Sequence, residues 1–134
     1  MAGELDLIKL RRQMEPKVHG ETFVYCCLLD FQVPAGLVPI CTFAEAEGLT
    51  AIVPKAQAER LGIPFEFESA MITLTVHSSL DAIGFLAVVS AALAAKDIPC
   101  NVVSAYYHDH LLVPPGKLPE SLAVLKALAE RGQP

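Results

Sequence analysis

Hydrophobic and polar residues alternate over residues 71–77, where Ile72, Leu74 and Val76 fall on one side. This period of two predicts a β-strand with one buried face. The pattern changes over residues 81–96 to a run rich in Ala, Leu and Val that is apolar almost all round. Such a run predicts a helix that packs on its own sheet and also on a second subunit or domain.

A second β-rich run, residues 100–107, follows this helix and leads into the sequence Tyr-Tyr-His-Asp-His. His108 and Asp109 are residue types that accept a positive φ angle, so they predict a two-residue hairpin turn. Before the helix, Ser78 and Ser79 can accept hydrogen bonds from its first amide groups. The central part of the chain is therefore predicted as strand, helix, strand, turn, strand.

The rest of the chain also switches between helical and extended patterns. Phe65 and Phe67 alternate with glutamates and predict either a short strand or a linker. The other predicted elements are a helix over 5–14, an apolar strand over 23–29 covered on both faces, a hairpin of 38–43 and 49–53, a helix over 55–61 capped by Gly62, and a last helix from Pro119.

These elements predict the α+β class, with two ferredoxin-like (βαββαβ) halves built on antiparallel sheets. We place the halves at residues 1–67 and 68–134. Neither half is complete, because the first lacks an opening strand and the second lacks a closing one. An exposed apolar edge is an aggregation hazard, so we expect the halves to share or exchange an edge strand.

Composition narrows the classes of function. The chain has 134 residues, a net charge of −5 and a sequence pI of about 5.3 without a basic patch, which argues against nucleic-acid binding. No apolar run approaches the roughly 20 residues that span a bilayer, and no secretory signal is visible, so we expect a cytoplasmic protein without membrane association. The hydrophobic content of 53% exceeds the usual range of about 45–50% and predicts an oligomer interface, most simply in a homodimer.

The four cysteines carry no metal-site or redox spacing. Cys26, Cys27, Cys41 and Cys100 include no C-x-x-C pair, and each falls in a predicted apolar strand. We therefore expect buried thiols that behave as small hydrophobes, with Cys26 and Cys27 on opposite faces of one strand.

The segment from Asp81 to Ser104 resembles the ACT domain, in which a small residue at a strand-to-helix junction precedes a long apolar helix and a second strand. More closely, nearly the whole chain is similar to small stand-alone bacterial ACT-containing proteins. Two motifs carry this closer resemblance, Val-His-Ser-Ser-Leu at residues 76–80 and Tyr-Tyr-His-Asp-His at residues 106–110.

The resemblance implies an amino-acid site at the strand-to-helix junction, commonly across a dimer interface. Amide groups at a helix N-terminus suit a carboxylate, and Gly84 allows close approach. Asp81 would oppose a carboxylate unless it contacts the ammonium group of the ligand. Alternatively, the serines are only caps and Gly84 only a packing residue. The candidate ligand-binding residues are His77, Ser78, Ser79, Leu80, Asp81, Ala82, Ile83 and Gly84, together with Asn101, Val102, Val103 and Ser104 on the facing strand.

The second candidate is the Tyr-Tyr-His-Asp-His segment. Its Tyr106, His108 and His110 either line a ligand pocket or lie in a solvated turn. His108, Asp109 and His110 are the alternative metal ligands, because residues two apart on a strand share a face. No phosphate loop, G-x-S-x-G elbow or H-E-x-x-H motif is present, and no cofactor is indicated.

The leading hypothesis is a non-catalytic regulatory module that binds an amino acid or similar small zwitterion and forms a homo-oligomer. A metal-dependent enzyme that uses His77 with the His108, Asp109 and His110 cluster is one alternative. A structural interaction domain without a ligand is the other.

Overall fold

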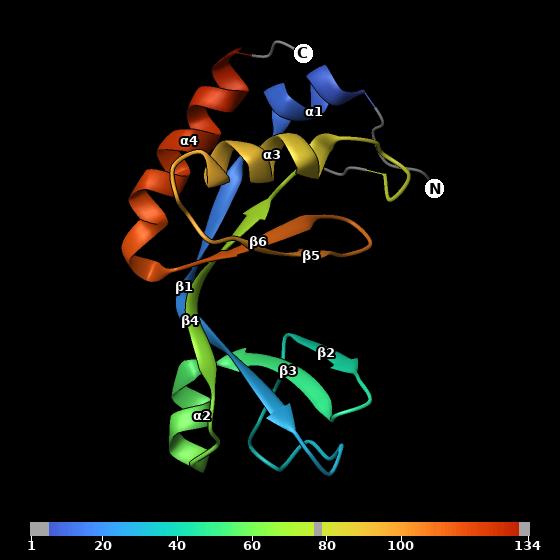
Figure 1. The fold of residues 1–134 in the computed structure, drawn as a ribbon, viewed down its shortest axis with the longest axis vertical. Helices are drawn as coiled ribbons and strands as arrows, with labels where there is room; N and C mark the ends of the chain where they lie inside the picture. Colours follow the sequence, from blue (N-terminus) through green and yellow to red (C-terminus); the bar gives the residue numbers. More distant parts are fainter. Residues whose placement is uncertain (1–5, 77–78, 132–134) are drawn as a thin grey trace. The chain divides into compact units, whose positions relative to one another are not determined.

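The computed structural model describes residues 6–76 and 79–131. Its elements run α1 (Leu7–Gln13), β1 (Pro16–Leu28), β2 (Cys41–Ala44), β3 (Leu49–Pro54), α2 (Lys55–Leu61), β4 (Glu66–Leu74), α3 (Phe85–Ala94), β5 (Asn101–Ser104), β6 (Asp109–Val113), a 3₁₀ turn (Pro115–Lys117) and α4 (Leu118–Arg131) (Figure 1).

The chain forms two compact units that do not follow the sequence in order. Residues 20–70 form one unit, and residues 1–19 join residues 71–134 in the other. We refer to them as the inserted unit and the main unit. The division is discontinuous because the long strands β1 and β4 each contribute residues to both units. The predicted halves, in contrast, were continuous in sequence and met between residues 67 and 68.

Each unit has the four-stranded order of a ferredoxin-like fold. The order is β2-β3-β1-β4 in the inserted unit and β1-β4-β6-β5 in the main unit. Each sequence half therefore obtains its fourth strand from the other half. The prediction of an α+β fold with two ferredoxin-like halves and an exchanged strand is confirmed, and the exchange occurs within one chain.

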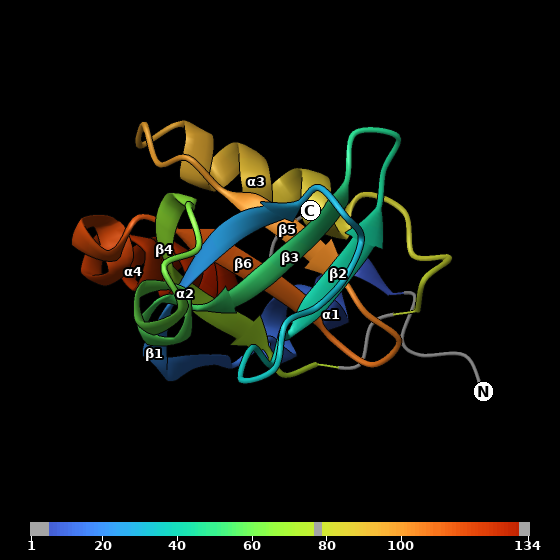
Figure 2. The same ribbon diagram turned by 90° about the horizontal axis from the view of Figure 1, so that it is seen from below.

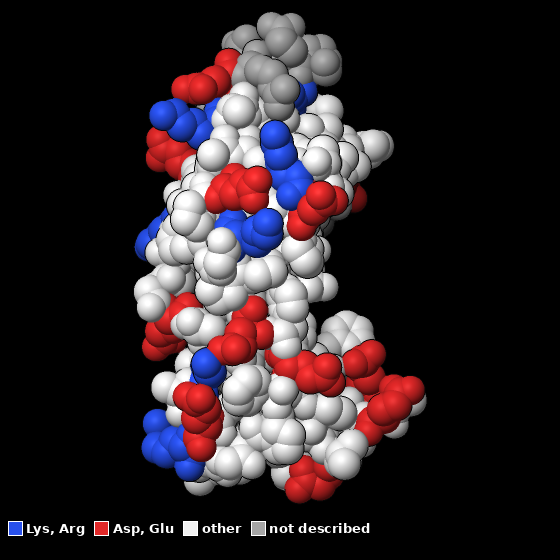
Figure 3. Space-filling model, turned by 60° about the vertical axis from the view of Figure 1, so that its left-hand side comes forward, with Lys and Arg blue, Asp and Glu red and all other residues white. Residues whose placement is uncertain are grey.

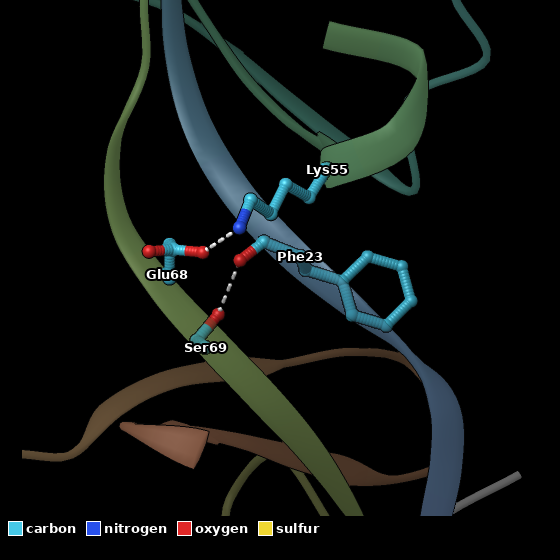
Figure 4. A network of polar contacts seen from close by, with 4 residues as sticks. All are labelled: Phe23, Lys55, Glu68 and Ser69. Atoms are coloured by element: carbon cyan, nitrogen blue, oxygen red, sulfur yellow. Dashed lines mark hydrogen bonds and ion pairs between the residues drawn. The ribbon is translucent and has the colours of Figure 1, made fainter. Parts of the chain in front are cut away.

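The inserted unit packs α2 against one face of its sheet, and Figure 2 shows β1, β3 and β2 of that sheet side by side. Its buried cluster contains Val24, Cys26, Leu28, Leu37, Ala51, Val53 and Ala58. Gly62 ends α2 with φ +66°, the left-handed cap predicted for it. At the start of α2, Lys55 forms an ion pair with Glu68 of β4, and the neighbouring Ser69 hydroxyl donates to the Phe23 carbonyl oxygen at 2.9 Å (Figure 4).

The main unit carries three helices, α1, α3 and α4, which contact one another and lie over its strands (Figure 1). Asp6 caps α1, because its carboxylate accepts hydrogen bonds from the amides of Ile8 and Lys9 at 3.0 and 3.2 Å. The largest fully buried side chains of these helices are Leu10, Val89, Leu93 and Leu125. They form the core that holds α3 in place.

The start of α3 differs from the prediction. The helix covers Phe85–Ala94, and Gly84 is its N-cap residue with φ +87°. Ser79 does not cap it, because the Ser79 hydroxyl accepts a hydrogen bond from the Asp81 amide at 3.1 Å and the Ser79 carbonyl accepts one from Ala82 at 3.0 Å. These bonds make a separate turn before the helix. His77 and Ser78 lie outside the described residues.

Three strand predictions also need correction. Residues 66–74 form the single strand β4 rather than a short strand or linker before a second strand. The β5–β6 loop spans residues 105–108 and is closed by a hydrogen bond from the Ala105 amide to the His108 carbonyl, so Asp109 opens β6 and no two-residue turn forms. Neither residue has a positive φ angle. β1 is not buried on both faces, because Cys27 is exposed.

Cys26 and Cys27 occupy opposite faces as predicted, but the four thiols are not all buried. Cys26 is buried, while Cys41 and Cys100 are only partly covered. Burial raises the pKa of Cys26, and it raises the pKa of Cys100 to about 11. Both thiols therefore stay protonated at neutral pH, which is the unreactive form.

Candidate functional site

A cavity of about 150 Å³ lies at the N-terminus of α3 in the main unit. The first amides of a helix have no intrahelical partners, and Gly84 has no side chain to cap them. These amides and the helix dipole make this end of the cavity favourable for a negatively charged group. The lining residues are Ser79, Leu80, Ala82, Gly84, Phe85, Leu86, Ala87, Ser104 and Asp109.

Part of the cavity lining comes from the end of the β5–β6 ladder. Ser104 and Asp109 are directly paired in the antiparallel register, so their side chains share one face of the sheet. Asp109 is only 5% exposed. A carboxylate at this position attracts a cationic group that enters the cavity, because opposite charges interact strongly where little water screens them. The cavity lining thus combines the N-terminus of α3, a buried carboxylate and two hydroxyl groups.

The cavity gathers only part of the predicted ligand-binding set. Of the junction and the facing strand, it includes Ser79, Leu80, Ala82, Gly84 and Ser104. Outside its lining lie Asp81, Ile83, Asn101, Val102, Val103, Tyr106, His108 and His110. Asp81 and Ile83 are exposed to solvent instead.

The cavity lining also includes Phe85, Leu86 and Ala87, which the sequence-based set omits, and Asp109, which the sequence placed only in the alternative metal set. The late start of α3 explains the first three, because the first helical turn falls at 85–87 and not at 81–84. A glycine just before a long apolar run could have indicated this boundary, since glycine is an acceptable N-cap residue. A prediction that Asp109 pairs with Ser104 would have required the length of the β5–β6 loop, which the sequence did not determine.

The histidines of the second candidate segment separate into different environments. His110 on β6 and His19 on β1 lie on either side of Thr73 on β4, with the His110 Nδ1 and the His19 Nε2 each 2.8 Å from the Thr73 hydroxyl oxygen. This is a polar chain across three strands of the main unit. His108 lies in the preceding loop, and its ring centroid is 6.5 Å from that of His110. Tyr106 is 60% exposed and stacks at a tilt on Tyr107.

The environment of His110 disfavours its charged form. Burial lowers the pKa of His110, and the imidazoles of His108 and His19 lower it further, while Asp109 opposes the shift. Within residues 6–76 and 79–131, no group of three or more His, Cys, Asp or Glu side chains is arranged to hold a metal ion.

We expect the free energy of unfolding to fall as the pH drops below about 6.5, the ordinary pKa of histidine. The unfolded chain then binds a proton at His110 that the folded chain resists, so stability is lost between the unfolded and the lowered folded pKa. The change His110→Asn keeps a polar atom near the Nδ1 position but cannot titrate. Urea unfolding at about pH 7.5 and about pH 5.5 should show a smaller pH effect in H110N than in the unmodified protein. An equal pH effect in both would contradict this assignment.

The chain matches two family models described as ACT domain, one at residues 2–70 and one at residues 66–129. No curated protein sequence matches it. In the part of the chain described by the structure, no helix is both long and apolar enough to cross a bilayer.

Several solved structures resemble the chain. A Vibrio cholerae protein of unknown function, for which a transport role has been suggested, is 34% identical with a TM-score of 0.80, and the match covers 92% of this chain and 95% of that one. An Agrobacterium tumefaciens protein is 16% identical with a TM-score of 0.74, over 87% and 90% of the two chains. The ligand-free regulatory subunit of aspartate kinase from Thermus thermophilus shares the fold at 8% identity, with a TM-score of 0.61 over 87% and 97%.

Proposed function

This chain belongs to the ACT-domain family, and from that premise we propose that it is a non-catalytic regulatory module that binds an amino acid or similar small zwitterion. The cavity at the N-terminus of α3 is the observation that supports this proposal most directly. The likeness in fold to a regulatory subunit of aspartate kinase agrees with a regulatory role.

The cavity offers complementary groups for the two charges of a zwitterion. The ligand carboxylate lies at the first amides of α3, where the helix dipole favours it. The ligand ammonium lies at Asp109, which is buried in the cavity lining. The hydroxyls of Ser79 and Ser104 supply further hydrogen bonds.

The size of the cavity favours a small ligand. An engineered cavity of about 150 Å³ in another protein takes up benzene, a molecule of six non-hydrogen atoms. The cavity here is of the same size, so it suits an amino acid with a short side chain. Binding orders the turn before α3 and shifts the packing of that helix. These two changes transmit ligand binding to the rest of the protein.

The proposal is tested by thermal unfolding in the presence of each amino acid, with and without EDTA. A ligand that binds only the folded state at 100 times its Kd adds about 2.7 kcal/mol to the free energy of unfolding. Stabilisation by one small amino acid is the expected result. Destabilisation by EDTA favours the metal-dependent alternative, and indifference to both treatments favours a structural domain.

We expect Gly84→Ala to remove the ligand-induced stabilisation. Gly84 has φ +87° at the cavity, and an alanine there costs about 1–2 kcal/mol and displaces the first amides of α3. Gly62→Ala is the matched control, because Gly62 also has a left-handed φ of +66° but lies at the end of α2 outside the cavity. Both variants should lose similar stability in urea. Equal ligand responses in G84A and G62A would count against the site.

We also propose that the protein is a homodimer formed through α3. The outward side of this helix exposes the small side chains Ala87, Ala91 and Ala94, which permit close approach of a second helix. Light scattering after size-exclusion chromatography would measure the mass in solution. A monomer at all concentrations would refute the dimer without affecting the binding proposal.

A further inference from the structure

The net charge of the protein is concentrated in the inserted unit. Residues 20–70 contain seven carboxylate side chains and two cationic ones, so this unit accounts for the whole net charge of −5. On the face drawn in Figure 3, Asp and Glu side chains cover much of the surface of this unit. Both cations are engaged, because Lys55 is paired with Glu68 and Arg60 donates to the Gly36 carbonyl at 3.3 Å. The unit therefore presents an acidic surface.

The same unit has a sheet face that is not part of its buried cluster. The register places Tyr25, Ile52 and Cys41 in one cross-strand row and Cys27, Thr50 and Phe43 in the next. These six residues are defined as the β2 face, in which Cys27 and Phe43 are exposed, Tyr25, Cys41 and Thr50 are half-buried and Ile52 is buried. Their neighbours on β1 and β3 point the other way, into the buried cluster, whereas Thr42 and Ala44 on β2 are exposed. Phe43 is 70% exposed, so a large aromatic side chain stands in solvent at the outer end of this face.

The β2 face ends at an open strand edge. β2 is the last strand in the order of the inserted unit, so within the described residues no strand pairs with its outer side. The segment before β2 also exposes apolar side chains, namely Leu29, Phe31, Val33, Val38 and Ile40. Soluble proteins usually protect such an edge with charges or cover it. Here the acidic residues Glu45 and Glu47 directly follow the strand.

We propose that the β2 edge and β2 face bind an extended segment of a partner protein that carries apolar and basic residues in alternation. Such a segment adds as a further strand, with its apolar side chains on Phe43 and its basic side chains near Glu47 in the turn after β2. The Glu45 carboxylate lies on the β2 face, where it accepts a hydrogen bond from the Thr50 hydroxyl at 2.6 Å. Charge complementarity selects this occupant over a second copy of the chain, because two acidic units would repel one another.

The test uses short fluorescein-labelled peptides and fluorescence anisotropy. The three peptides alternate Val with Lys, Val with Glu, and Ser with Lys. The Val/Lys peptide is expected to bind at least about tenfold more tightly than either of the others, since it alone supplies both apolar contacts and positive charge. Added salt should weaken its binding, because exposed charges are screened.

Variants connect the binding to this surface. Phe43→Ser should weaken the Val/Lys peptide by about tenfold or more, and Glu47→Gln should reduce the salt dependence. Val18→Ser changes an exposed strand residue of the main unit and should have no effect. Phe43 is exposed, so F43S should keep its thermal unfolding transition. Tight binding of the Val/Glu peptide, absence of Val/Lys binding, equal binding by F43S, or self-association that F43S abolishes would each overturn the proposal.

Discussion

Replacing Asp109 with asparagine should weaken binding of the small zwitterion by at least about 30-fold, the largest effect on ligand affinity that we expect from one substitution. Asp109 is buried and lines the cavity at the α3 N-terminus. Truncating one partner of a buried, hydrogen-bonded charge pair costs about 2–5 kcal/mol, because the other charge loses its partner in a desolvated site. Isothermal titration calorimetry with the amino acid identified by thermal unfolding measures the change directly.

The parallel variant Asp81→Asn distinguishes two locations for the ammonium group. Asp81 was the sequence-based candidate, but its side chain is exposed and does not line the cavity. Its amide hydrogen bond to Ser79 involves only backbone on its side and survives the substitution. Ligand affinity should therefore change little in D81N. Loss of affinity in D81N together with normal affinity in D109N would place the ammonium group at the turn and refute the assignment to Asp109.

Replacing Leu93 with alanine should lower the free energy of unfolding by about 2–5 kcal/mol, the largest stability change among our predictions. Leu93 is completely buried, on the side of α3 that faces the core of the main unit. Its truncation leaves a cavity that the surrounding side chains fill only in part. Urea unfolding gives the free energy, and an unchanged m-value shows that the two-state transition is preserved.

The matched change is Leu29→Ala. Leu29 is 77% exposed, so its truncation removes few contacts and should change the free energy of unfolding by less than about 0.5 kcal/mol. A similar loss of free energy of unfolding in both variants would contradict this prediction. It would mean that the substitution acts on the unfolded state and not on the packing of α3.

Local signals allowed much of the fold to be predicted. The Gly62 cap and the bounds of α2 follow from a short apolar helix between Pro54 and a glycine, and both are confirmed. The β2–β3 hairpin and α4 are confirmed in the same way, since each depends on residues close together in the chain. The start of α3 was predicted wrongly because two serines and an aspartate are equally good signals for a turn, and the hydroxyl of Ser79 serves a turn here.

Contacts between distant residues account for what the sequence could not give. His19 and His110 both contact Thr73, over separations of 54 and 37 residues. No periodicity predicts which residues of three strands stand opposite one another. The cavity is similar, because Asp109 reaches it only through the register with Ser104 and through a four-residue loop in place of a two-residue turn. The sequence shows which of these side chains are polar or titratable, but it does not show which residues they contact.

The exchange of strands between the sequence halves has a consequence for synthesis on the ribosome. Residues 16–19 of β1 belong to the unit completed by residues 71–134, so they have no native partners while the inserted unit is being translated. At about 5–20 residues per second, the wait lasts on the order of 10 s. During that time the nascent chain exposes an unpaired strand end, and the main unit cannot form until residues 71–134 have been translated.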